Sequence, residues 1–318
     1  MLTSWVIKVK KALASRYLFD NWYSLLIKYT LARIGFNVKL RARIGDCTIE
    51  LDPEVFARFV SRFSHRFLIR SVKCIDGRLF INDVEVNDIS DVIYSLETFA
   101  KVLGWNYIIP LHCWIKDGVK FRHIHWPILE VFDFSEYDAL NVRDRVVVDV
   151  GSFICDSPIY FALKGAKRVI AIEPCSGAYA EMFENVRLNN LENVIVPVNA
   201  YLVSEQGKAH LEDDEIKDSM TTHQNYDDRA LVVTLNDIIS KYGIDGDAAL
   251  KMDCEGCEYD IILNDYAHVK LFDEIILEYH SNVGGKPSKL LKVLSCDYRC
   301  KIVEKLGRNF GIIHCVRK

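Results

Sequence analysis

The sequence predicts an α/β protein in which a doubly wound, mainly parallel sheet follows a smaller mixed α+β region. From about residue 126 onward, strand-like and helix-like patterns alternate strictly, which is typical of βαβ units. The expected strands, such as VVVDV and VIAIE, are apolar throughout, as parallel strands covered on both faces are. With 318 residues, half of them hydrophobic, the chain can bury a sizeable core in one large or two ordinary domains.

We place the domain boundary between residues 125 and 126. In the region 1–125, two basic helices precede short alternating strands. Asp76-Gly77 separates two alternating runs, a strong signal for a hairpin turn. Residues 88–104 read as one helix that ends at Gly104.

The region 126–318 is expected to contain its elements in a fixed order. They are a strand at 145–150, a helix at 157–165, a strand at 168–174, a helix at 176–190, a strand at 193–200, a helix at 234–243, strands at 248–253 and 273–280, a helix at 286–294, and two closing strands within 299–316. In such sheets ligands bind beyond the carboxyl ends of the strands.

The charge of the chain is uneven. The formal net charge of −4 gives no general reason to expect nucleic acid as a partner. Residues 1–45, however, carry nine basic residues and one acidic residue, with aromatic residues interleaved at helical spacing. The simpler interpretation is a pair of packed helices with solvated charges, and the alternative is a face that meets an anionic membrane surface or a polyanionic substrate. No apolar run reaches the ~18 residues of a spanning helix, and no signal-peptide pattern is present. We therefore expect a cytoplasmic protein, with peripheral membrane contact through residues 1–45 as the alternative.

The ten cysteines are scattered along the chain. We expect most of them to be reduced and buried as small hydrophobic side chains, and Cys254 and Cys257 to be structural. A zinc site formed with Cys296 and Cys300 is a minor alternative. If the source is a hyperthermophile, intracellular disulfides become possible.

The stretch VVVDVGSFICDSPIYF, residues 146–161, raises the question of a cofactor. A dinucleotide site would need GxGxxG, and of those glycines Gly151 alone is present; the P-loop pattern is absent. S-adenosylmethionine has no phosphate, so its loop tolerates Phe153 and Cys155 at the later positions. Glu173 ends the next strand, 22 residues after Gly151, where a carboxylate can accept both ribose hydroxyls.

Four segments in order carry a family resemblance: VVVDVGSFICDSPIYFALKGAKRVIAIEP, FENVRLNNLENVIVPVNA, VVTLNDI and LKMDCEGCEYDIIL. Together they resemble FkbM-type S-adenosylmethionine-dependent methyltransferases over residues 126–318, which implies the class I methyltransferase, Rossmann-like fold. The resemblance implies that Asp149, Gly151 and Ser152 line the methionine side, that Glu173 and Pro174 hold the ribose, and that Asn199 and Ala200 border the adenine. It also implies that Tyr137, in the lead-in segment, folds over the cofactor. Residues 1–125 resemble N-terminal extensions of archaeal members.

The resemblance implies methyl transfer to a hydroxyl of a sugar, a lipid-linked glycan or a secondary metabolite. A base must take the hydroxyl proton, and the candidates lie in DCEGCEYD and ILEYH. We predict Asp253, Glu255 and His280 as catalytic residues, with Glu258 and Glu278 as further candidates. Asp253 is expected to orient the acceptor or His280.

Three alternatives stay open at this point. No metal site is assigned, but a hard cation held by Asp253, Glu255 and His280 is the second interpretation of Asp253. An RNA methyltransferase is a rival, although the [DN]PP[FY] tetrapeptide common in base amino-methylation is absent. A non-catalytic protein that retains the cofactor fold is the other rival.

Overall fold

The structure is a computed structural model, and it describes residues 15–64, 68–205, 230–283, 285–305 and 309–318. The chain divides into two compact units, Met1–Leu129 and Glu130–Lys318. The division falls four residues after the predicted boundary and lies inside helix α6 (Trp126–Phe132).

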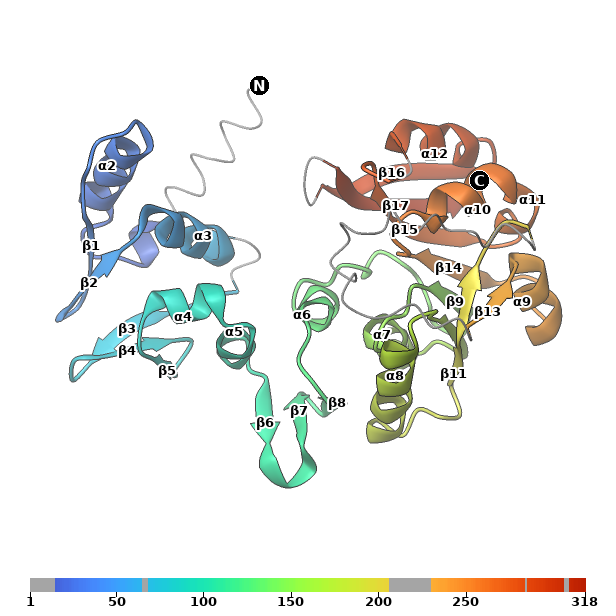
Figure 1. Cartoon of the computed structure of the whole chain (residues 1–318), viewed down its shortest axis with the longest axis horizontal. Coiled ribbons are helices and arrows are strands. Elements are labelled where there is room, and N and C mark those ends of the chain that lie inside the picture. The colour runs from blue at the N-terminus through green and yellow to red at the C-terminus, as the bar shows by residue number, and fades with distance from the viewer. Residues whose placement is uncertain (1–14, 65–67, 206–229, 284, 306–308) are drawn as a thin grey trace. The chain divides into compact units, whose positions relative to one another are not determined.

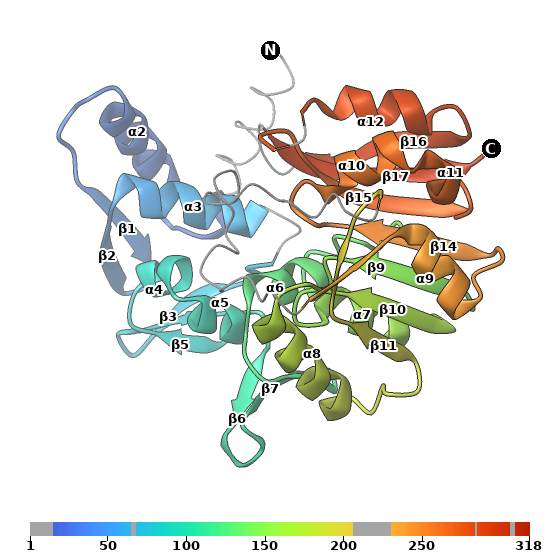
Figure 2. The ribbon, with the colours of Figure 1, turned by 45° about the vertical axis from the view of Figure 1, so that its right-hand side comes forward.

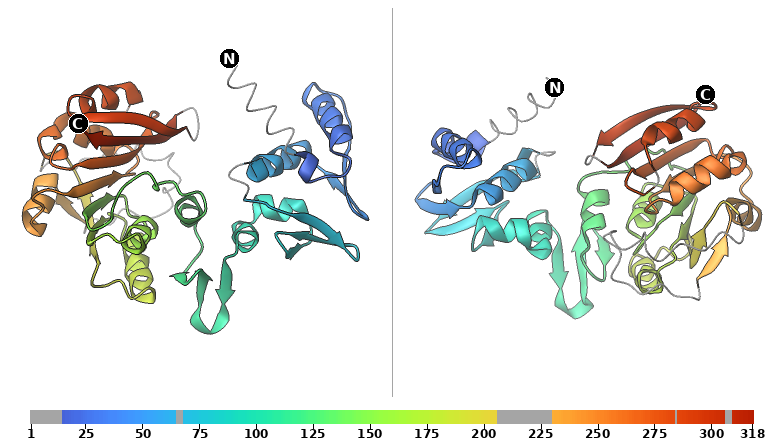
Figure 3. Two further views of the ribbon diagram at one scale, coloured as in Figure 1. Left: turned by 180° about the vertical axis from the view of Figure 1, so that it is seen from behind. Right: turned by 45° about the horizontal axis from the view of Figure 1, so that its top comes forward.

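The first unit combines short helices with three small antiparallel sheets, β1–β2, β3–β4–β5 and β6–β7–β8 (Figure 3). Its elements are η1 (Ser15–Tyr17), α2 (Trp22–Arg33), β1 (Leu40–Ile44), β2 (Cys47–Leu51), α3 (Pro53–Ser64), β3 (Val72–Ile75), β4 (Arg78–Ile81), β5 (Val84–Val86), α4 (Ile89–Tyr94), α5 (Leu96–Val102), β6 (Asn106–Ile108), η2 (Ile109–Leu111), β7 (Cys113–Lys116) and β8 (Val119–Phe121).

Local signals in the first unit were partly correct. The hairpin at Asp76-Gly77 is confirmed: both residues have positive φ, 49° and 74°, and they join β3 to β4. The single helix at 88–104 is wrong, because Ser95 is extended and its hydroxyl caps a second helix by accepting from Thr98 N. Of the two basic helices, the second is α2. The first, with Trp5, Lys8, Lys10 and Lys11, lies outside the described residues.

The second unit is built on one seven-stranded sheet with the order β11-β10-β9-β14-β15-β17-β16 (Figures 1 and 2). The first five strands are parallel, and β17 runs antiparallel to both of its neighbours, β15 and β16. The strands are β9 (Val146–Val150), β10 (Arg168–Ile172), β11 (Ile195–Val198), β14 (Ala248–Met252), β15 (Glu274–His280), β16 (Tyr298–Lys305) and β17 (Phe310–Arg317), with β12 (Ala200–Leu202) and β13 (Leu231–Val233) forming a separate parallel pair.

Helices cover both faces of this sheet. One face packs on α9 (Leu235–Tyr242), α10 (Cys257–Asn264), α11 (Tyr266–Val269) and α12 (Pro287–Leu294) through a core that includes Val148, Val150, Leu250 and Leu277. The alternate residues of the strands point to the opposite face, where α7 (Asp156–Leu163) and α8 (Ser176–Leu188) follow β9 and β10. This arrangement confirms the predicted doubly wound, Rossmann-like fold.

The cysteine prediction was wrong for six residues. Disulfides join Cys47 to Cys74, Cys254 to Cys257, and Cys300 to Cys315. Cys300 and Cys315 face each other across β16 and β17, so Cys300 does not join Cys254 and Cys257 in a zinc site. Cys113 and Cys155 are free and buried, as predicted, whereas Cys175 is half-buried and Cys296 is exposed.

Candidate active site

The predicted site residues converge at the carboxyl ends of four neighbouring parallel strands. Gly151 follows β9, Glu173 follows β10, Asp253 follows β14, and His280 is the last residue of β15. The chain order reverses between β9 and β14, and this switch point is where open α/β sheets bind ligands. Gly151 has φ 76°, and a Cβ there would lie 1.7 Å from the carbonyl oxygen of Asp253. Glycine is therefore required for the loops after β9 and β14 to touch.

Asp149 is fully buried and paired with a lysine that the sequence reasoning missed. Its Oδ1 lies 3.0 Å from Lys251 Nζ, its direct neighbour on β14, and its Oδ2 accepts from Ser157 Oγ at 2.7 Å. Lys251 also donates to the carbonyl oxygen of Gly151 at 2.8 Å. Burial raises the pKa of Asp149 although Lys251 and Ser157 act to lower it. Asp149 therefore supports the Gly151 loop through Lys251, which binds both of them. Its predicted contact with the methionine side of the cofactor stays a prediction.

The loop between β9 and α7 holds side chains in conformations that favour glycine. Phe153 has φ 44° and Cys155 has φ 79°, both in the left-handed region. Ser152 is buried and its hydroxyl donates to the carbonyl oxygen of Asp149 at 2.9 Å, which closes the turn. The loop is thus fixed by its own hydrogen bonds despite having a single glycine.

Glu173 is tied to the tip of the same loop. One carboxylate oxygen accepts from Phe153 N at 2.9 Å and the other from Cys175 N at 2.8 Å. Burial nevertheless raises the pKa of Glu173. Asn199 Nδ2 donates to the carbonyl oxygens of Glu173 and Pro174, at 2.9 and 3.0 Å, so the predicted adenine-side residue braces the predicted ribose-side segment. Ala200 is fully buried in β12.

Tyr137 links the lead-in segment to the predicted catalytic residues. It is buried, and its hydroxyl donates to Asp253 Oδ2 at 2.9 Å. The Lys251 ammonium lies 5.3 Å from the centre of its ring, within the range of a cation–π contact. The structure therefore brings Tyr137 to the acceptor side of the site, and its predicted contact with the cofactor stays a prediction.

His280 stands among four carboxylates. Its Nδ1 lies 3.2 Å from Glu258 Oε1, and its Nε2 lies 3.4 Å from Glu255 Oε2, 4.0 Å from Asp253 Oδ1 and 4.0 Å from Glu278 Oε1. Burial lowers the pKa of His280, but the hydrogen bond with Glu258 and the charges of Asp253 and Glu255 outweigh it and raise the pKa to about 9. Burial and then Asp253 raise the pKa of Glu278 to about 10.

Two further buried carboxylates lie near this group. Burial, and more weakly the charges of Asp149 and Asp253, raise the pKa of Asp156, the first residue of α7, to about 7, although Lys251 opposes the shift. The Oδ1 of Asp156 has no hydrogen-bond partner among the described residues. The side chain of Glu136 is nine-tenths buried, and burial and the charges of Glu130 and Asp253 raise its pKa. Lys251 could have been predicted as a functional residue because it is the one polar residue in the apolar run AALKM. The sequence around Asp156 has no comparable signal.

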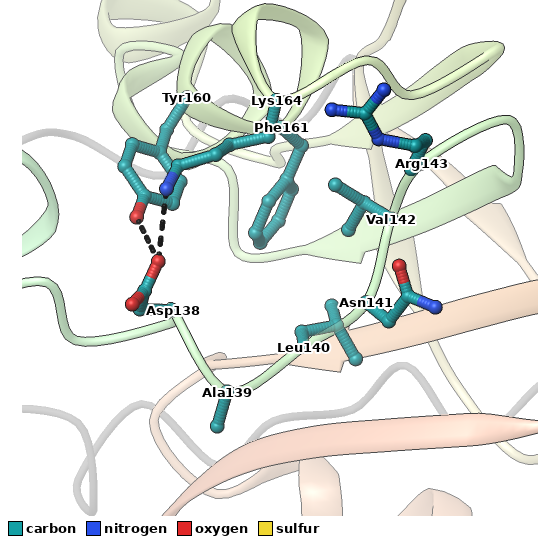
Figure 4. A pocket seen from close by; sticks show the side chains of 9 residues that line it. All are labelled: Asp138, Ala139, Leu140, Asn141, Val142, Arg143, Tyr160, Phe161 and Lys164. Atoms are coloured by element: carbon teal, nitrogen blue, oxygen red, sulfur yellow. Dashed lines mark hydrogen bonds and ion pairs between the residues drawn. The ribbon is translucent and has the colours of Figure 1, made fainter.

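A separate cavity of about 300 Å³ runs along α7, between that helix and the segment 138–143 (Figure 4). At its edge Asp138 accepts hydrogen bonds from Tyr160 and Lys164, both at 2.9 Å. None of the predicted site residues lines this cavity. This cavity is therefore distinct from the group of predicted site residues at the strand ends.

The residues at the strand ends fit S-adenosylmethionine. Gly151 gives the close loop approach that a Cβ would block, and Glu173 offers a fixed carboxylate at the end of β10. The cofactor is cationic at its sulfonium and at its ammonium group, and the Oδ1 of Asp156, at the end of the loop that contains Gly151, has no hydrogen-bond partner among the described residues. Among the described residues at these strand ends, Gly151 is the single glycine of the loop, so the loop lacks the glycine-rich backbone that would cradle a pyrophosphate.

Comparison with solved structures finds methyltransferases at low identity. The O-methyltransferase from Bacillus cereus, in complex with SAH, is 12% identical over 62% of this chain and 92% of that chain, with a TM-score of 0.36. The ribosomal protein L11 methylase from Lactobacillus delbrueckii subsp. bulgaricus is 13% identical over 62% and 81%, with a TM-score of 0.38. The precorrin-6y C5,15-methyltransferase from Geobacter metallireducens is 14% identical over 59% and 89%, with a TM-score of 0.34.

No curated protein sequence matches the chain. Among the described residues, no helix combines the length and the apolar character that crossing a bilayer would need. The family comparison starts at Asp149, so the likeness of residues 1–125 to archaeal members has no support from it. Residues 149–300, which include Glu173, Asp253 and His280, match the model of the methyltransferase FkbM domain, so most of the second unit is similar to that domain.

Proposed function

We propose that the protein is an S-adenosylmethionine-dependent O-methyltransferase that acts on a hydroxyl of a sugar, glycan, lipid-linked or secondary-metabolite acceptor. The observation that carries the proposal is the contact between the Gly151 loop and the backbone of Asp253. It joins the loop suited to a methyl donor to the group of residues suited to a hydroxyl acceptor. Proximity and orientation of this kind supply a large part of the rate enhancement in transfer reactions.

The cofactor would be held by residues of the first two strand ends. Gly151 gives room beside the methionine part, and the Glu173 carboxylate, held by Phe153 N and Cys175 N, accepts from the ribose hydroxyls. Asp156, the first residue of α7, would offer its Oδ1 to the cationic groups of the cofactor. When bound, S-adenosylmethionine supplies an electrophilic methyl group.

The chain's own task is to orient the acceptor hydroxyl and to receive its proton. His280, with a pKa of about 9, already carries a proton near neutral pH and is a donor rather than a base. Burial raises the pKa of Glu255, which improves this carboxylate as a proton acceptor. We assign the proton to Glu255 and the orientation of the acceptor to Asp253, whose Oδ2 is fixed by Tyr137.

Calorimetry with S-adenosylhomocysteine and NAD tests the cofactor class. We expect saturable binding of S-adenosylhomocysteine and none of NAD; the reverse would overturn the proposal. Asp253→Asn and Glu255→Gln should each lower methyl transfer by about 100-fold or more, in the range of a lost acid–base group. Both should keep binding within about threefold, since neither has a role in holding the cofactor. Glu192→Gln, which changes an exposed carboxylate in the loop before β11, is the matched control.

Methyl-labelled cofactor incubated with fractionated cell extract tests the acceptor class. The proposal expects label in glycan, lipid-linked or small-molecule fractions that alkali treatment does not release as an ester. Label confined to RNA would instead favour the RNA methyltransferase alternative. No label in any fraction, together with intact S-adenosylhomocysteine binding, would favour the non-catalytic alternative.

We also propose that the first unit contacts anionic membrane surfaces through α2. Tyr23 and Ile27 of α2 and Ile34, the residue that caps its C-terminus, are 67%, 47% and 67% exposed and stand at helical spacing, next to Arg33. Triple replacement of these residues by serine should lower sedimentation with phosphatidylserine vesicles several-fold at low salt. Leu271→Ser, at another exposed apolar position, should leave sedimentation unchanged. Equal sedimentation of the wild type and the triple variant would refute membrane contact.

A further inference from the structure

Three metal-ligating side chains face one another at the ends of β14 and β15. Asp253, Glu278 and His280 each present one ligand atom, and these atoms all lie within 4.8 Å of one another. The shared direction follows from strand geometry, because residues 278 and 280 are two apart on β15 and point to the same face of the sheet. Tyr137 holds Asp253 Oδ2, which leaves Oδ1 toward His280 Nε2 at 4.0 Å.

The ring of His280 is oriented as metal-binding histidines are. Glu258 is fully buried and accepts from Gly256 N at 2.9 Å and from His280 N at 3.1 Å, so it is an acceptor fixed by two backbone donors. Its Oε1 also lies 3.2 Å from His280 Nδ1, and a carboxylate there requires a proton on Nδ1. The other nitrogen, Nε2, points at carboxylates; without a cation it carries the second proton of the imidazolium, and a cation bound there would displace that proton. A carboxylate behind a ligating histidine is the usual outer partner of a metal site.

A second observation indicates a cation at this place. Glu136 is 9% exposed, its carboxyl accepts no hydrogen bond from the described residues, and it directly precedes Tyr137, whose hydroxyl holds Asp253 Oδ2. The buried Lys251 is already engaged by Asp149 and the carbonyl oxygen of Gly151. Buried carboxylates are normally paired or coordinate a metal, so the unpaired Glu136 favours the binding of a cation at this place.

We propose that Asp253, Glu278 and His280 bind one divalent cation of the Mn²⁺ or Mg²⁺ type. Two carboxylate oxygens and one imidazole nitrogen suit a hard or borderline cation that keeps its other positions for water or for a substrate oxygen. Ligand bonds of about 2.0–2.2 Å place neighbouring ligand atoms about 3–4 Å apart. The present separations of 4.0 Å from Nε2 to each carboxylate need a small contraction of the side chains.

The cation would bind the oxygen of the acceptor and acidify its hydroxyl, so that the Glu255 carboxylate suffices to take the proton. This role rests on the proposed methyltransferase function, whereas the existence of the cation site does not. A vicinal diol, which can offer two oxygens to one cation, is the acceptor class that this site fits.

Mn²⁺ binding to the full chain tests the site. The protein is treated with EDTA, desalted, and titrated with Mn²⁺ while the electron paramagnetic resonance signal of free Mn²⁺ is recorded. We expect one saturable site per chain, weakened at least tenfold by Glu278→Gln and unchanged by Glu192→Gln. Pulsed spectra of the bound ion should show nitrogen coupling that is lost in His280→Gln. Mg²⁺ should compete for the same site.

Glu278→Gln should stabilise the metal-free protein and weaken its binding of Mn²⁺. Removing a carboxylate that is surrounded by other carboxylates should raise the midpoint of unfolding of the metal-free protein, while Mn²⁺ affinity falls. No saturable Mn²⁺ binding in the wild type, equal binding in Glu278→Gln, or bound Mn²⁺ without nitrogen coupling would each overturn the proposal. Calorimetry of S-adenosylhomocysteine with the metal-free protein separately tests the proposed function, so the failure of one is distinguishable from the failure of the other.

Discussion

The buried pair of Asp149 and Lys251 offers the most quantitative test of how the candidate site is built. The two side chains are 0% and 2% exposed, and 3.0 Å separates Oδ1 from Nζ. Asp149→Asn keeps the shape of the side chain but leaves the Lys251 ammonium buried opposite a neutral group. Removing one partner of a buried ion pair costs about 3–5 kcal/mol. We expect a loss of this size in the free energy of unfolding of the second unit.

The double variant separates pairing from the burial of each charge. Lys251→Met alone should also cost about 3–5 kcal/mol, because it strands the Asp149 carboxylate. Asp149→Asn combined with Lys251→Met removes both charges, and we expect the loss to shrink to about 1–3 kcal/mol, part of it from the unpaired carbonyl oxygen of Gly151.

The assay must report on the correct unit. All five tryptophans lie within residues 1–129, so intrinsic tryptophan fluorescence follows the first unit. Hydrogen exchange of peptides from β9 and β14, measured by mass spectrometry across a urea series, follows the second unit directly. Additive losses in the double variant, or a loss below about 1 kcal/mol for Asp149→Asn, would refute the pairing argument. If S-adenosylhomocysteine binding returns with stability in the double variant, Asp149 acts by supporting the loop and not by contacting the cofactor.

Three other predictions follow from contacts at the site and from the cysteine pairs. The pKa of Asp156 is about 7 in the folded protein against 3.8 in the unfolded chain. The stability that its proton provides is therefore full below about pH 4 and is lost as the pH rises through 7. Asp156→Asn should be stabilising by up to about 4 kcal/mol at pH 8 and nearly neutral at pH 4, measured by the same hydrogen-exchange assay. Glu173→Gln keeps one acceptor of two and should weaken S-adenosylhomocysteine binding by about 10-fold or more in calorimetry, since each charged hydrogen bond contributes about 1.5–3 kcal/mol; unchanged affinity would remove Glu173 from the cofactor site. A thiol reagent should label four cysteines in denatured, unreduced protein and ten after reduction, and labelling of ten without a reductant would disprove the three disulfides. The double variant Cys254→Ser with Cys257→Ser should stay folded and bind no less metal than the wild type.

The strand ends of the second unit were predictable because parallel, doubly covered strands leave a clear trace in the sequence. VVVDV, RVIAI and AALKM are mainly apolar runs, each followed by glycine or an acidic residue, and they appear as β9, β10 and β14. Once the sheet order is known, the rule that ligands bind at carboxyl ends brings Gly151, Glu173, Asp253 and His280 together. That part of the site follows from local patterns and one general rule of topology.

Contacts between strands distant in sequence were not predictable in the same way. Asp149 meets Lys251 because β9 lies beside β14 in one particular register, and about one hundred residues separate them. A shift of one residue would turn Lys251 to the opposite face. The bond between Cys300 and Cys315 depends on register in the same manner, and spacing alone suggested a partner in the CxxC pair instead.

The segment DCEGCE shows how one irregular turn builds both sides of the cluster. Glu255 has φ 54° and Gly256 has φ 121°, and a Cβ on Gly256 would lie 2.7 Å from Val283 Cγ1, so the chain reverses tightly there before α10 begins at Cys257. After this reversal, Glu255 lies beside His280 Nε2, and Glu258, in the first turn of α10, lies beside His280 Nδ1. From the sequence Glu258 was only a further candidate, because a carboxylate near a helix start is usually solvated. Its burial follows from Gly256 N and His280 N, two backbone donors that a surface residue would leave to water. The spacing D-x-E-x-x-E therefore places two carboxylates on the reactive side of one imidazole and one behind it.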